Sequence, residues 1–267
     1  MQAIDTSKYR NILFGWSGRI LTVTFNRPEK LNAFNSEMHR EMALLFPDIS
    51  ADPDSDIVVL TGAGRAFSAG GDLDFLEECR RNPPAFHETL REARTIIMSL
   101  LDCDKPIICR LNGDAVGLGA TLALFCDIII AANSARIGDP HVRVGAVAGD
   151  GGAVIWPQLI GYARAKQFLL TGDLLDAEQA AAMGLINFAV PAEDLDGAVA
   201  EWTMRLSKGA PRAVRWTKAT VNAGLKQLAA TVMDTGLAYE GLSARTDDHG
   251  EALKAMREKR KPNFTGR

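Results

Sequence analysis

Hydrophobic positions along the chain change their period repeatedly, and each change predicts a new element. Two runs rich in β-branched and aromatic residues flank Ser17-Gly18, which predicts a β-hairpin. Continuous apolar runs within Asp56–Thr61, Ile107–Leu111 and Ile128–Ala132 predict buried strands. Between the predicted hairpin and Asp56 the apolar residues recur at helical spacing, so one helix face is predicted to be buried: Met38, Met42, Leu45 and Phe46.

Two of the predicted strands run into helices through turns made of small residues. The first turn contains Gly70-Gly71 and is followed by Asp72, a predicted helix N-cap; the second is Gly117-Leu118-Gly119. After Asp150 the pattern is mostly helical, and from Glu193 it is helical and charged up to a basic tail. Three glycines are predicted to end helices in this half: Gly161, Gly172 and Gly184.

The alternation of strands and helices predicts the α/β class, as one large domain or one domain with an appendage. Hydrophobic residues make up 47% of the 267 positions, which is enough for a large core. Basic and acidic residues nearly balance, at 30 and 33, so a nucleic-acid-binding protein is not expected.

The sequence also gives expectations about the cellular location of the protein. No apolar run is long enough to span a membrane, and the first ten residues lack an apolar leader. Four cysteines are scattered without C-x-x-C spacing, which favours buried thiols in a reducing compartment over disulfides or zinc. We therefore expect a cytoplasmic protein with no metal site.

The two small-residue turns carry the candidate chemistry. Bare backbone at a helix N-terminus can aim N–H groups at one point, and two such groups converging on a carbonyl oxygen form an oxyanion hole. Each donor in such a hole contributes roughly 2.7–4 kcal/mol to the transition state. The alternative is that the glycines only allow tight turns and close packing, and spacing alone does not decide between the two.

Four stretches carry a wider resemblance: "NRPEKLNAFNSEM", "GAGRAFSAGGDL", "NGDAVGLGATLALFCDIIIAANSARIGDPHVRVG" and "LLTGDLLDAEQAAAMGLINFAVP". In this order the chain resembles the enoyl-CoA hydratase/isomerase family, the crotonase superfamily. The resemblance implies a ββα superhelix over residues 1–200 that binds acyl-CoA. It also implies a helical segment over residues 201–267 that serves oligomerisation and covers the active site. Homotrimers or dimers of trimers, acyl-CoA thioester substrates and an enolate-like intermediate are further implications.

Site residues follow from the same resemblance. It makes the backbone N–H groups of Gly71 and Leu118 the oxyanion donors. Coenzyme A is expected only as part of the substrate, with no separate cofactor, and an ordinary surface cation is the alternative for Arg27 and Lys30. The residues expected to contact coenzyme A are Arg27, Lys30, Leu31, Ala33, Ala69, Asp72, Leu73, Lys261 and Phe264.

This chain departs from the family's hydratases at two positions. Those enzymes use two glutamates, and the matching positions here are Thr121 and His141. A histidine has a usual pKa near 6.5, so His141 is a candidate general base, with a loop hydrogen bond as the alternative. Asp150 is a second candidate or a helix N-cap, and Thr121 is expected to shape the pocket.

The sequence also gives expectations for the other titratable residues and leaves several alternative functions open. Glu240 is a further possible acid, with a solvated helix face preferred, while His39, His87 and His249 are expected at the surface. The segment Phe75–Thr95 is expected to cover the acyl end. An acyl-CoA hydrolase, a C–C bond lyase and a non-catalytic acyl-CoA-binding protein are alternatives. Another is a serine hydrolase using Ser68, which lies one residue away from a G-x-S-x-G pattern.

Overall fold

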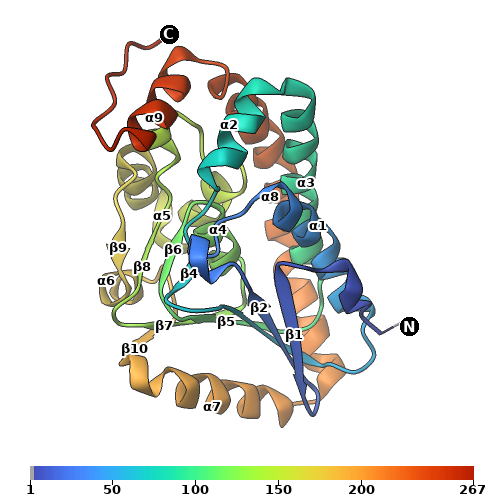
Figure 1. Cartoon of the computed structure of the whole chain (residues 1–267). Helices are drawn as coiled ribbons and strands as arrows, with labels where there is room; N and C mark the ends of the chain where they lie inside the picture. Colours follow the sequence, from blue (N-terminus) through green and yellow to red (C-terminus); the bar gives the residue numbers. More distant parts are fainter. Residues whose placement is uncertain (1–2) are drawn as a thin grey trace.

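The structure is a computed structural model that describes residues 3–267, and two sheets organise it (Figure 1). The larger sheet has the order β1-β2-β3-β5-β7-β10, and the smaller one has the order β4-β6-β8-β9. The larger sheet consists of β1 (Ile12–Ser17), β2 (Ile20–Phe25), β3 (Ile57–Gly62), β5 (Ile107–Leu111), β7 (Ile128–Ala132) and β10 (Phe188–Val190). The smaller sheet consists of β4 (Ala66–Ser68), β6 (Asp114–Val116), β8 (Arg136–Gly138) and β9 (Leu175–Asp176).

Helices surround both sheets. The first half of the chain contributes α1 (Ser36–Ala51), α2 (Leu73–Arg81), α3 (Pro83–Asp102) and α4 (Leu118–Leu124). The second half contributes α5 (Gly152–Thr171), α6 (Ala177–Ala182), α7 (Leu195–Ser207), α8 (Pro211–Ser243) and α9 (Asp247–Arg257). Short 3-10 turns lie at Thr6–Lys8, Pro28–Lys30, His141–Val144 and Ala192–Asp194. No helix within the described residues is both long enough and apolar enough to cross a membrane.

The chain forms a superhelix of repeated ββα turns. Strands β3, β5 and β7 lie in the larger sheet, and each is followed by a short strand of the smaller sheet, namely β4, β6 and β8. After each such pair a helix returns the chain to the start of the next turn. The β1–β2 hairpin is antiparallel and opens the larger sheet, whereas the pairings of β2, β3, β5, β7 and β10 are parallel. The predicted α/β class and ββα superhelix are confirmed.

The predicted elements correspond closely to the observed ones. The hairpin turn, the strand Ile107–Leu111 and the buried face of α1 are present as expected. The Asp72 side chain caps α2 by accepting a hydrogen bond from the backbone N–H of Asp74. Gly161 has φ 77° and ψ 159° and kinks α5 in its middle, while Gly172 caps the end of that helix in the left-handed region.

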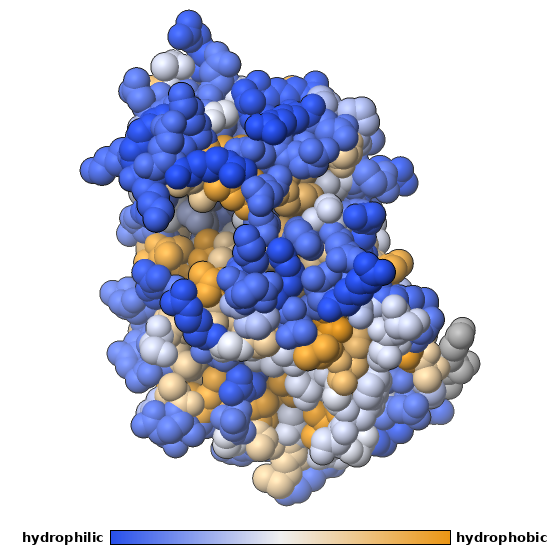
Figure 2. Space-filling view, viewed as in Figure 1, coloured by the Kyte–Doolittle hydropathy of each residue, from blue (hydrophilic) through white to orange (hydrophobic). Residues whose placement is uncertain are grey.

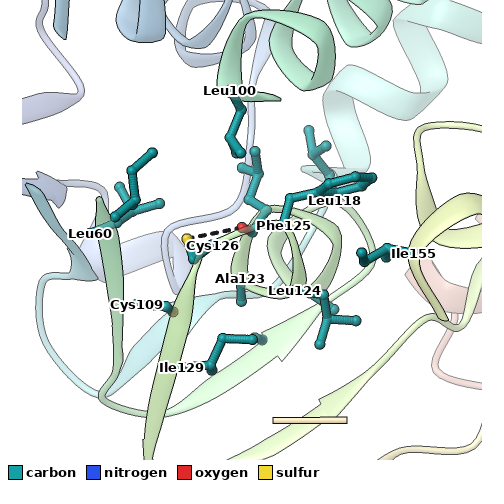
Figure 3. Packing of buried hydrophobic residues seen from close by; sticks show 14 of the residues in the cluster. Leu60, Leu100, Cys109, Leu118, Ala123, Leu124, Phe125, Cys126, Ile129 and Ile155 are labelled. Carbon is teal, nitrogen blue, oxygen red and sulfur yellow. Dashed lines mark hydrogen bonds between the residues drawn. The ribbon is translucent and has the colours of Figure 1, made fainter. Parts of the chain in front are cut away.

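The main core lies between the larger sheet and helices α1, α3, α4 and α5. Helix α4 is buried along its whole length, because it is surrounded by strands on one side and helices on the other (Figure 3). Cys126 follows α4 and donates its thiol proton to the carbonyl of Leu122 (Figure 3). All four cysteines are free and buried, as expected. A second, smaller core forms where α7 covers the opposite face of the larger sheet (Figure 1).

Candidate active site

The first small-residue turn is held open by main-chain hydrogen bonds on both sides of Gly71. The N–H of Phe34 donates to the carbonyl of Gly70 at 2.7 Å, and the N–H of Asp72 donates to the carbonyl of Phe34 at 2.9 Å. Phe34 is fixed in turn by an edge-to-face contact with Phe25, at 5.5 Å between ring centroids. The N–H of Gly71 finds no acceptor among residues 3–267.

The second turn places a matching group beside the first. Gly117 has φ 55° and ψ −125°, a conformation open to glycine, and its N–H donates to the carbonyl of Gly138 at 3.0 Å. The next N–H, that of Leu118, starts α4 and has no acceptor within the described part of the chain. A Cβ added to Gly70 would lie 2.8 Å from the carbonyl oxygen of Val116, so the two turns are in direct contact.

Both turns open onto one cavity of about 180 Å³. Its walls are mostly apolar, with Leu76 and Cys79 of α2, Phe86 of α3 and Met256 of α9 among them. Figure 2 shows hydrophobic surface in a hollow below the hydrophilic upper part of the molecule, where Figure 1 places α2 and α9. The expectation that Phe75–Thr95 covers this end of the site agrees with the positions of Leu76, Cys79 and Phe86.

The polar side of the cavity is a chain of buried titratable groups centred on His141. Its Nδ1 hydrogen-bonds the carboxylate of Asp139, and its Nε2 lies 3.6 Å from Oδ2 of Asp150. The hydroxyl of Thr121 donates to the other Asp150 oxygen at 3.3 Å. A Cβ on Gly117 would lie 3.6 Å from Cε1 of His141, so the ring lies next to the second oxyanion turn.

In this cluster the pKa values of both His141 and Asp150 are raised, as the net result of burial and the neighbouring charges. Burial disfavours the charged His141 ring, but the carboxylates of Asp139 and Asp150 outweigh it and raise the ring's pKa well above 6.5. At neutral pH His141 is therefore an imidazolium and holds two protons, rather than the ready base that its usual pKa predicts. Burial raises the pKa of Asp150, and the positive His141 opposes that rise.

Glu240 on α8 joins the same cavity, so the prediction of a solvated helix face was wrong. Burial, with the nearby negative charge of Asp150, raises its pKa from 4.5 to about 8. Its Oε2 is buried and has no hydrogen-bond partner in the described chain. A local pattern could not reveal this, because the groups that bury Glu240 lie about ninety residues earlier, around Gly149 and Asp150.

Asp139, His141 and Asp150 are residue types that bind metals, and one ligand atom of each lies within 4.8 Å of the others. Asp139 lies at Nδ1 and Asp150 lies at Nε2 of the same imidazole ring, which also suits stabilisation of the protonated ring by two carboxyl groups. Asp139 was not singled out in the sequence, although its position two residues before His141 is the signal that could have found it.

The residues expected to hold coenzyme A lie in different surroundings, from the cavity wall to the exposed surface. Ala69 lines the cavity, and its N–H donates to the carbonyl of Leu31, which itself is in the left-handed region at φ 53°. Arg27 is half-buried and its guanidinium binds the Asp72 carboxylate at 3.1 Å, so much of its charge is already neutralised. The carbonyl of Ala33 also accepts a hydrogen bond from Arg27. Leu73 is the first residue of α2. Three of the expected residues are exposed: Lys30, Lys261 and Phe264.

Three further expectations are corrected. Ser68 is fully buried, and its hydroxyl donates to the carbonyl of Asn32, so it is not placed as an accessible nucleophile. His39 and His249 are not at the surface, since they are only 4% and 3% exposed. His39 pairs with Glu92, and His249 lines the cavity; His87 is exposed as expected.

Comparison with known proteins fits this architecture. The sequence model of the enoyl-CoA hydratase/isomerase family matches residues 16–267, and the chain belongs to that family. It is an enzyme family, and the chain is 35% identical to the 1,2-epoxyphenylacetyl-CoA isomerase of Escherichia coli over 93% of this chain and 95% of the relative.

Solved structures agree with this assignment. A crystal structure of an enoyl-CoA hydratase/isomerase from Mycobacterium paratuberculosis has a TM-score of 0.88 and 34% identity, covering 91% of this chain and 97% of that one. A β-diketone hydrolase from the cyanobacterium Anabaena, bound to (S)-3-oxocyclohexyl acetic acid, has a TM-score of 0.85 and 32% identity, covering 91% and 98%.

Proposed function

We propose that the protein acts on an acyl-CoA thioester and moves a proton between carbons of the acyl group through an enolate. The observation that carries the proposal is a pair of N–H groups, those of Gly71 and Leu118, which have no acceptor among residues 3–267 and lie beside the buried acids and His141. These donors would bind the thioester oxygen and stabilise the negative charge that develops on it. The relatives of this chain include a CoA-ester isomerase, which supports the substrate class.

Asp150 is the base in this proposal. It removes a proton from the carbon beside the thioester, and the electron pair of that C–H bond moves toward the carbonyl to give the enolate. Burial raises the pKa of Asp150, and the imidazolium of His141, held by Asp139, opposes that rise and so favours the carboxylate that accepts the proton. His141 is thus a positioning and charge-balancing partner of the base.

Glu240 supplies the complementary acid. With a pKa of about 8 it holds a proton at neutral pH. A base and a proton donor close to the same substrate are the arrangement that acid–base catalysis requires. Glu240 protonates the enolate at a different carbon, which shifts the double bond, and the proton taken by Asp150 passes to Glu240 before the next cycle begins, which restores both groups. This chemistry fits isomerisation without the two glutamates of the hydratases.

Assembly and location extend the proposal. We infer a homotrimer or a dimer of trimers, with residues 1–200 as the acyl-CoA-binding core and residues 201–267 serving assembly and cover. The cavity contacts of α8 and α9 support the covering role. Coenzyme A enters as part of the substrate, and the acid–base steps call on no separate cofactor. Four free buried thiols support a reducing, cytoplasmic location.

The test is incubation of the protein with saturated, 2-enoyl, 3-enoyl and β-keto CoA esters in deuterated water, followed by mass spectrometry. We expect deuterium in the 2-enoyl and 3-enoyl esters together with interconversion of the two. Asp150→Asn should abolish both, while Thr121→Val, which removes only one hydrogen bond to Asp150, should retain a measurable rate. Binding of the esters without exchange or conversion would contradict the proposal and favour a non-catalytic acyl-CoA-binding protein.

A second candidate is hydrolytic cleavage of the C–C bond between two carbonyl groups. The similarity to the Anabaena β-diketone hydrolase favours it, together with a buried His–Asp pair that can orient water. Water would attack one carbonyl, the C–C bond would break, and the other carbonyl would leave as an enolate at the oxyanion donors. The same panel separates the two candidates, because cleavage shortens the β-keto ester and leaves the enoyl esters unconverted.

A further inference from the structure

His249 is a buried histidine in the cavity wall that the proposed reaction does not use. It lies on α9, and its Nδ1 is 2.7 Å from the carbonyl oxygen of Val144. A carbonyl oxygen only accepts hydrogen bonds, so Nδ1 must carry the ring proton. The other ring nitrogen, Nε2, is therefore the hydrogen-bond acceptor of the neutral ring, and it has no protein partner among residues 3–267.

The surroundings keep this ring neutral. Burial lowers the pKa of His249, and the positive charges of Arg80 and His141 lower it further, although the bond to Val144 opposes them. Arg80 reaches this place from α2, since a Cβ added to Gly250 would lie 2.6 Å from its guanidinium. A hydrogen-bond acceptor in the cavity wall that no described residue satisfies favours a ligand that brings a donor.

The donor must come from a part of the ligand other than the reacting atoms. The thioester carbonyl belongs at Gly71 and Leu118, and the reacting carbons belong beside Asp150 and Glu240. The same cavity wall also contains the apolar residues Val144, Ala244 and Met256. An apolar wall with a single acceptor is suited to a hydrocarbon chain that carries one hydroxyl group.

We propose that His249 selects acyl groups that bear a hydroxyl beyond the reacting carbons, by accepting a hydrogen bond from that hydroxyl at Nε2. The proposal rests on the proposed function, because it takes the occupant of the cavity to be a CoA ester. It narrows the substrate class from acyl-CoA in general to hydroxylated acyl-CoA. His249 contacts the substrate without moving its protons, so it sets specificity.

The experiment measures dissociation constants by calorimetry for hexanoyl-CoA and for its 4-, 5- and 6-hydroxy derivatives. At one hydroxyl position we expect binding about tenfold tighter than that of hexanoyl-CoA. Two variants separate ligand contact from structural support. His249→Asn can still donate to Val144 but has no group at the Nε2 position, whereas His249→Gln can place an amide oxygen there. The preference should vanish in the first variant and persist in the second.

Each other outcome overturns the proposal in a distinguishable way. Equal binding of all four esters by the unaltered protein would remove the hydroxyl selection but leave the proposed function intact. Equal weakening of all esters in His249→Asn would mean that the ring contacts the shared coenzyme A portion instead. No binding of any ester would contradict the proposed function itself. Melting curves of both variants verify folding, and ¹⁵N shifts of the unaltered protein must show the proton on Nδ1.

Discussion

Two buried histidines in this molecule pair with carboxylates, yet they stand in different surroundings. His39 on α1 lies 2.7 Å from the Glu92 carboxylate on α3, and its ring packs 5.7 Å from that of Phe75 on α2. His141 binds Asp139 in a similar way, but its other nitrogen lies 3.6 Å from Asp150, and the ring lines the cavity. The first pair joins three helices, and the second adjoins the unpaired N–H groups.

The difference shows that a buried histidine–carboxylate pair is not by itself a catalytic signature. Both pairs satisfy a polar group inside the protein, which burial requires. The His141 pair adds a second carboxyl at the far nitrogen, a cavity for a substrate and backbone donors that have no other partner. The function therefore depends on the groups that face the second ring nitrogen, the one that the first carboxylate does not bind.

The largest expected effect tests this distinction at Asp150. Asp150→Asn should lower turnover by about a thousandfold, since the variant lacks the base that accepts the carbon-bound proton. Steady-state kinetics on the best CoA ester of the panel measure the loss. Binding of a saturated CoA ester should change less than threefold, roughly, because the thioester still meets the same donors. Turnover within a few fold of the unaltered enzyme would contradict the role of Asp150.

The oxyanion donors give the next effect in size. Gly71→Pro removes the N–H and should lower kcat/KM by a factor of about 10²–10³. The matched control is Gly71→Ala, which retains the donor; its Cβ would meet only the flexible Leu76 side chain, at 3.0 Å. An active proline variant would show that Gly71 gives the reacting oxygen no hydrogen bond.

The pH dependence of activity and stability also distinguishes the two histidine sites, because Glu240 lies beside His141 and has no counterpart beside His39. Activity should fall as pH rises through about 8, because Glu240 loses the proton that it donates. Stability should fall too. Between pH 4.5 and about 8 the unfolded chain has released this proton while the folded protein keeps it. The free energy of unfolding then drops by up to about 1.4 kcal/mol per pH unit.

Glu240→Gln is the variant that tests this linkage. In this variant the free energy of unfolding should no longer fall as the pH rises from 4.5 to about 8, because glutamine does not titrate. Thermal melts from pH 5 to about 9 measure the slope for both proteins. The same slope in the variant would assign the pH dependence to another group.

The smallest effect on activity is expected at the His39–Glu92 pair. Glu92→Gln should lower the free energy of unfolding by about 1–3 kcal/mol, because the buried His39 ring loses its charged partner. Turnover should change less than about threefold. Denaturant titration together with steady-state kinetics tests both. A large loss of turnover without destabilisation would place His39 in the reaction and erase the contrast with His141.

The C-terminal segment, residues 201–267, shows which features could be predicted from the sequence and which could not. Its helical character and its basic tail could be read from residue pattern, and α8 and α9 are present. The inward positions of Glu240 and His249 could not, because polar residues on an isolated helix are expected to face solvent. His249 is bound to Val144, which lies 105 residues earlier in the chain.

By itself, the sequence determined what depends on neighbours along the chain. The hairpin, the buried face of α1, the cap at Asp72 and the two small-residue turns follow from local spacing and backbone freedom. The tertiary structure decided what depends on distant segments. It made His141 an imidazolium between two carboxylates, kept a proton on Glu240 and tied Arg27 to Asp72. Burial and electrostatic potential are sums over residues that only folding brings together, so no local pattern could supply them.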